Sequence, residues 1–74
     1  MIKRQYADST YVKVNGKEKD IAGQNLLEYL EETGYRPERV VVERNLEILA
    51  REDLGNITIQ DEDTIEVLEF MGGG

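Results

Sequence analysis

The chain has 74 residues, so it is expected to form a single domain with a thin hydrophobic core. It contains no cysteine and no histidine, which excludes disulfides, thiolate or imidazole metal sites, thiol nucleophiles and histidine-based triads. The absence of cysteine also fits a reducing compartment, so a cytoplasmic location is expected. The net charge of −7 argues against nucleic acid and anionic membranes as partners, and apolar runs no longer than Val40–Val42 predict no membrane span or signal peptide.

The first expected elements are two short strands joined by a tight turn. Residues Tyr11–Val14 alternate, with both valines on one face. Asn15–Gly16 follows, a dipeptide that favours a hairpin because both residues tolerate positive φ. The returning strand over residues 17–21 carries Lys17 and Lys19, which is typical of a sheet edge that avoids pairing with other chains.

A helix is expected over residues 23–33, because its three leucines fall on one helical stripe with glutamates outside it. Asn25 or Gly23 is expected to cap its start. Gly34 stands where a left-handed C-cap belongs, and Pro37 confirms that the helix has ended.

Three further strands are expected in the second half of the chain, over residues 40–42, 47–49 and 64–70. Residues 44–46 form a turn between the first two of them, and residues 51–54 a single helical turn closed by glycine. The order of elements predicts an α+β fold: a mixed sheet of four or five strands with one main helix across one face.

One face of this sheet is expected to lack a cover. Alternation places Ile65 and Val67 toward the helix, and the apolar side chains that point away from it form an exposed patch. Such a patch marks an interface, with nearby glutamates steering a basic partner. The predicted interface residues are Val41, Leu68, Phe70, Met71, Glu66 and Glu69. The alternative is that Phe70 or Met71 folds over the edge of the domain.

The remaining polar groups are interpreted as surface residues. The Asp61–Asp63 segment is expected to be a solvated turn, not a cation site, because it lacks the glycine of a ligand loop. The lysines are interpreted as solubility residues, and Tyr29 and Tyr35 as packing residues beside the helix stripe.

The last strand runs directly into Gly72, Gly73 and Gly74. Glycines here predict a mobile tail that passes through a narrow channel and leaves the terminal carboxylate sterically open. This tail and four earlier segments of the chain resemble the ThiS sulfur-carrier family of thiamine biosynthesis, in the wider group that includes MoaD. The segments are Val14–Lys17, Val40–Asn45, Glu47–Arg51 and Asp61–Val67. The chain departs from the family pattern at Glu62–Asp63, where Gly-Asp is usual, and at Ala50, where proline is common.

The resemblance implies a β-grasp, ubiquitin-like fold. Because the polar first ten residues have no counterpart in the family, the chain is expected to consist of an extension at residues 1–10, a domain at 11–71 and a flexible tail at 72–74. It implies that an E1-like (ThiF-like) enzyme uses ATP and magnesium to adenylate the Gly74 carboxylate. A sulfur donor protein would then convert Gly74 into a thiocarboxylate, whose recipient would be a (ThiG-like) thiazole synthase. The protein itself would be a co-substrate with no catalytic residue, metal or bound cofactor of its own.

Three alternatives stay open. The first is a MoaD-like carrier that serves molybdopterin or another metabolite, and the second is a ubiquitin-like modifier joined through Gly74 to lysines on targets. The third, from a different class, is a non-catalytic β-grasp binding module whose glycines are incidental.

Overall fold

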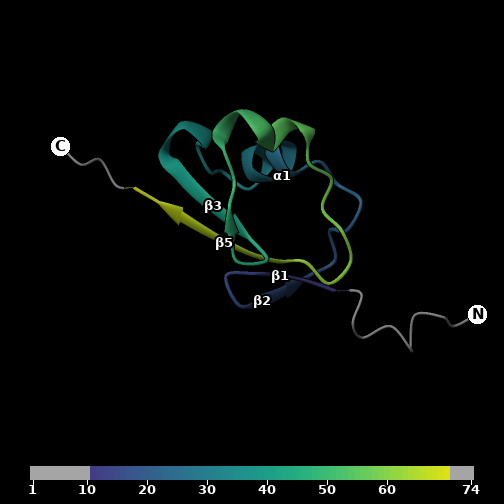
Figure 1. Ribbon diagram of the computed structural model, residues 1–74. Helices are drawn as coiled ribbons and strands as arrows, with labels where there is room; N and C mark the ends of the chain where they lie inside the picture. The colour runs from purple at the N-terminus through teal and green to yellow at the C-terminus, as the bar shows by residue number, and fades with distance from the viewer. Residues whose placement is uncertain (1–10, 71–74) are drawn as a thin grey trace, which may run out of the picture.

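A mixed five-stranded sheet crossed on one face by a helix forms the body of the molecule (Figure 1). The computed structural model describes residues 11–70. The strands are β1 (Val12–Val14), β2 (Lys17–Lys19), β3 (Val40–Arg44), β4 (Glu47–Ile48) and β5 (Thr64–Glu69), in the sheet order β2-β1-β5-β3-β4. β1 and β5 are parallel, and the other neighbouring strands are antiparallel. This arrangement confirms the predicted β-grasp fold. The predicted extension and glycine tail lie outside the described residues, so the division of the chain into three parts stays a prediction.

The β1–β2 hairpin forms at the predicted turn. Asn15 and Gly16 both have positive φ, at 52° and 84°. The returning strand is shorter than predicted, because pairing stops at Lys19 and Ile21 leaves the sheet to join the core. β2 lies at the edge of the sheet, as its lysines predicted.

The helix α1 (Leu26–Glu32) is also shorter than predicted. It starts later because Gly23 has a φ of 97°, outside the helical region, and Asn25 is the N-cap whose side chain accepts a hydrogen bond from the Glu28 amide at 3.0 Å. Gly34 ends it in the left-handed region, with a φ of 94°. Two short 3₁₀ helices, η3 (Pro37–Arg39) and η4 (Arg51–Asn56), complete the described elements. No helix within residues 11–70 has the length and apolar composition of a membrane span.

The hydrophobic core lies between the sheet and α1. Val40 and Val42 of β3 are buried, as are Ile65 and Val67 of β5, which confirms the predicted alternation. Twelve buried apolar side chains make up the core: Val12, Val14, Ile21, Leu26, Tyr29, Leu30, Val40, Val42, Leu54, Ile59, Ile65 and Val67.

The acidic turn before β5 is not wholly solvated, and the prediction is wrong for Asp63. The side chain of Asp63 is buried, and its carboxylate accepts hydrogen bonds from Asn45 Nδ2 and from the Gln60 amide, both at 2.9 Å. Arg44 Nη1 lies 3.7 Å from the same carboxylate. Asp63 therefore connects the turn before β5 to the turn between β3 and β4, while Asp61 and Glu62 remain exposed.

Candidate functional site

The outer face of the sheet, opposite α1, carries exposed apolar side chains. Val41 and Leu68 are directly paired across β3 and β5, so their side chains lie next to each other on this face. Leu68 is 65% exposed and Phe70 is 59% exposed. Phe70 therefore does not fold over the edge of the domain, although its amide donates a hydrogen bond to the Arg39 carbonyl at 2.8 Å.

Ile48 of β4 belongs to the same surface and was missed from the sequence. It pairs with Glu43, and its side chain is 73% exposed. The signal that could have found it is alternation in β4, because the following residue, Leu49, contacts the core and so leaves Ile48 on the other face. We call Val41, Ile48, Leu68 and Phe70 the outer-face patch.

A shallow groove of about 190 Å³ lies within this patch. Val41, Ile48 and Leu68 form its apolar lining, and Glu43 and Glu66 complete it. The two glutamates are directly opposite each other across β3 and β5. Like charges at this spacing repel each other, so a cationic group of a partner placed between them would relieve the repulsion.

The other predicted interface residues are placed differently. Glu69 pairs with Val40 and has the same strand phase as Val67, so it does not share the outer face with Leu68. Met71, Gly72, Gly73 and Gly74 lie outside the described residues, and their predicted roles stay predictions. The outer-face patch ends at Phe70, directly before them.

No group of three or more metal-ligating side chains is found among residues 11–70. The pKa of Tyr29 is raised because burial desolvates the phenolate and Tyr35 lies near it. Tyr29 lies on the helix side of the sheet, away from the outer-face patch.

Comparison with known proteins adds a family to this geometry. The model of the ThiS family matches residues 12–74. The crystal structure of a thiamine biosynthesis protein (ThiS) from Geobacter metallireducens superposes with a TM-score of 0.69 at 40% identity, over 86% of this chain and 99% of that one. The sulfur carrier protein TtuB of Thermus thermophilus is 44% identical over 59 residues, which are 78% of this chain and 85% of TtuB.

A longer relative is also similar over part of its length. A thiazole synthase of Magnetococcus marinus is 43% identical over 53 residues. These residues are 72% of this chain and 16% of that synthase, so the chain spans a small part of the synthase that it matches.

Proposed function

Because the chain belongs to the ThiS family, we propose that it is a sulfur carrier whose Gly74 carboxylate is activated and converted to a thiocarboxylate for thiazole formation in thiamine biosynthesis. The observation that carries the proposal is the family match, which runs through β5 to the glycines at 72–74. Glycine has no side chain, so such a segment fits a narrow channel and leaves its carboxylate open to attack.

The proposed chemistry takes place on Gly74 and uses groups that other proteins supply. An adenylating enzyme with ATP and magnesium joins the carboxylate oxygen to the α-phosphorus and releases pyrophosphate. The terminal sulfur of a donor protein's persulfide then attacks the acyl carbon, and AMP leaves. A thiolate then attacks the donor-side sulfur of the resulting acyl disulfide and forms a new disulfide with the donor protein, so that the thiocarboxylate leaves as Gly74–COS⁻. The carrier takes part as a co-substrate and supplies no acid, base or metal ligand.

The proposed partners are an adenylating enzyme, a sulfur donor and a thiazole synthase. Support for the synthase comes from the Magnetococcus marinus protein, because a segment similar to this chain occurs within a thiazole synthase. The outer-face patch is the proposed docking surface for the adenylating enzyme. Three of its apolar side chains are exposed, those of Ile48, Leu68 and Phe70, and the patch lies beside a pair of opposed glutamates. In sequence, Met71 alone separates Phe70 from the three glycines.

A carrier with a different recipient is the second candidate. The similarity to TtuB favours it, because TtuB is described as a sulfur carrier protein without mention of thiamine. Incubating the thiocarboxylated protein with the thiazole synthase of the same organism separates the two: thiazole formation supports the first candidate. Thiocarboxylate that the synthase leaves unconsumed favours the second.

The position of the Gly74 carboxylate provides the test of the carrier chemistry. Deleting Gly74 moves the carboxylate by about 3.3–3.6 Å along an extended chain. A misplacement of about 1 Å already costs on the order of a hundredfold in rate, so ATP–pyrophosphate exchange by the cognate enzyme should fall at least that far. Thermal stability should be unchanged, because a chain end contributes little to burial.

The matched control is a protein with one residue added before Met1, which alters the other end of the chain and should keep full exchange. If the protein without Gly74 supports full exchange and sulfur transfer, the terminal carboxylate is not the reactive group and the proposal is wrong.

A further inference from the structure

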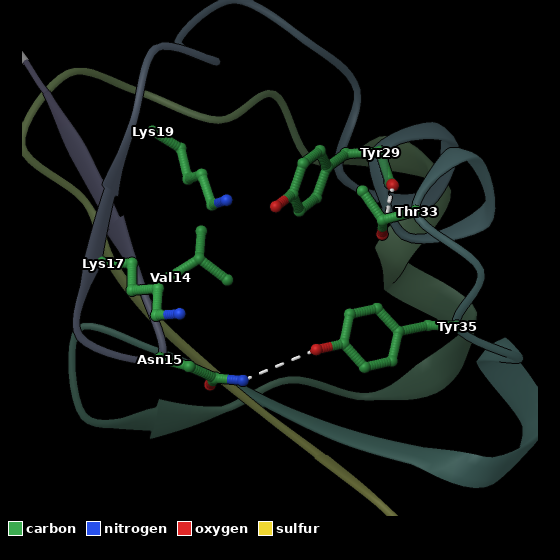
Figure 2. A pocket seen from close by; sticks show the side chains of 7 residues that line it. All are labelled: Val14, Asn15, Lys17, Lys19, Tyr29, Thr33 and Tyr35. Carbon is green, nitrogen blue, oxygen red and sulfur yellow. Dashed lines mark hydrogen bonds between the residues drawn. The ribbon is translucent and has the colours of Figure 1, made fainter.

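A second pocket lies on the helix side of the sheet, between β2 and the end of α1 (Figure 2). Its volume is about 300 Å³, which is at the lower end of the range for small-molecule sites. The described residues that line it are Val14, Asn15, Lys17, Lys19, Tyr29, Thr33 and Tyr35.

The register of the hairpin places both lysines at this pocket. Lys19 is opposite Val12 and Lys17 is opposite Val14, and residues opposite each other share a face of the sheet. Both valines are buried under α1, so the lysines extend from the edge strand on the helix side. Figure 2 shows their ammonium groups directed toward the space in front of the two tyrosines.

Within the part of the chain that the structure describes, no side chain lining the pocket offers the lysines a counter-charge. None of the described lining residues is acidic, although the chain has 16 Asp and Glu against 9 Lys and Arg. Within residues 11–70 the ion pair between Arg44 and Asp63 is the one present, and it does not involve either lysine.

The helix end does not need the lysines either. Thr33 Oγ1 donates hydrogen bonds to the carbonyls of Tyr29 and Leu30, at 2.9 and 3.1 Å, and the amides of Thr33 and Tyr35 bond the same two carbonyls. The carbonyls of Tyr29, Leu30 and Glu31 are therefore satisfied within the segment itself.

The facing wall presents hydroxyl donors. Asn15 Nδ2 lies 3.5 Å from Tyr35 Oη and donates to it, which leaves the hydrogen of that hydroxyl free to donate elsewhere. The pKa of Tyr29 is raised by burial and by Tyr35, so its hydroxyl stays protonated at neutral pH. Charges on an edge strand also discourage aggregation, but that role needs no facing wall of donors.

Two ammonium groups and two hydroxyl donors thus line the pocket, and none of its described lining residues is acidic. We propose that this pocket binds a small molecule through an oxyanion, which is either a phosphate or a carboxylate group. Lysine ammonium groups bind such oxyanions as point charges. Val14 and the faces of the tyrosines offer apolar contact to the rest of the ligand. This site is independent of the sulfur-carrier proposal, because it uses neither Gly74 nor the outer-face patch.

Asn15 connects the pocket to the last strand. Its Oδ1 accepts a hydrogen bond from the Val67 amide at 2.7 Å, and its Nδ2 donates to the Val67 carbonyl at 3.3 Å. An anion that binds Tyr35 would disturb the same amide group of Asn15. The Val67 amide is therefore a reporter of occupancy from outside the pocket.

The test is a titration of the ¹⁵N-labelled full chain followed by amide chemical shifts. Sodium phosphate is added in one arm and sodium acetate in the other, each at constant ionic strength balanced with sodium chloride. Saturable shifts are expected at Lys17, Lys19, Tyr35 and Val67. Saturation with phosphate alone identifies the ligand group as a phosphate, and saturation with acetate alone identifies it as a carboxylate. Saturation with both shows that the pocket binds either oxyanion.

Substitutions separate a built site from general attraction. Lys17→Gln and Lys19→Gln should each weaken binding about fivefold to tenfold, as expected for loss of one charge-assisted contact. Lys13→Gln removes the same charge from the outer face of β1 and should change the dissociation constant less than about twofold. Shifts that stay linear in both arms, or equal losses in all three variants, would overturn the proposal.

Discussion

Asp63 is the side chain on which the turn before β5 depends. Its carboxylate satisfies Asn45 Nδ2 and the Gln60 amide, and both lose their acceptor if it is removed. Asp63→Ala should therefore lower the free energy of unfolding by about 2–4 kcal/mol, measured by urea denaturation. Asp61→Ala, an exposed acid in the same turn, should change it by less than about 0.5 kcal/mol. Equal effects of the two substitutions would mean that the buried contacts of Asp63 do not stabilise the fold.

Glu62 occupies a backbone conformation that suits glycine. Its φ is 71°, and this is the position at which glycine is usual in the family pattern. A residue with a Cβ atom loses about 1–2 kcal/mol of stability in this region, and glycine avoids that cost. Glycine also raises the entropy of the unfolded chain, which cancels part of the gain in stability. Glu62→Gly should raise the free energy of unfolding by about 0.5–1 kcal/mol. Glu62→Ala keeps the Cβ atom and removes the charge, so a gain of the same size in that variant would attribute the effect to charge and not to the backbone.

At the scale of the strand, neighbouring residues of β5 should respond in opposite ways. Leu68 is exposed on the outer face, so Leu68→Lys should weaken binding to the proposed adenylating enzyme at least about tenfold, with a stability change within about 0.5 kcal/mol. Val67→Lys places a charge in the core and should unfold the domain. Calorimetric binding and thermal melts of both variants provide the measurement. A cooperative loss of stability in Leu68→Lys would show that this side chain supports the fold.

Local patterns predicted the elements well, and pairings between distant residues account for two features that they missed, the buried Asp63 and the second pocket. The alternation of Val40 and Val42 and the Asn15–Gly16 turn depend on neighbours in sequence, and both were predicted correctly. The burial of Asp63 depends on Asn45, 18 residues away, and no periodicity reveals it. The same holds for the second pocket, where Asn15 meets Tyr35 across 20 residues, so two tyrosines interpreted as packing residues also line a cavity.

At the scale of the whole molecule, the two proposed binding surfaces lie on opposite faces of one sheet. The outer-face patch spans β3, β4 and β5, while the second pocket lies between β2 and α1. A protein docked on the first leaves the second accessible to a small ligand. β5 connects the two surfaces, because Leu68 lines the groove of the first and the Val67 backbone is hydrogen-bonded to Asn15, which lines the second.

The central place of β5 has a mechanical consequence. β5 runs between β1 and β3, and its hydrogen bonds to them lie across the direction of the strand. A force that pulls on the chain after Phe70 would load these bonds in shear, all at once, and the two bonds from the Asn15 side chain would share the load. For a pull along the strand axis, the bonds do not break one at a time, as they would in unzipping. An enzyme could therefore draw the end of the chain taut without unravelling the domain that it holds.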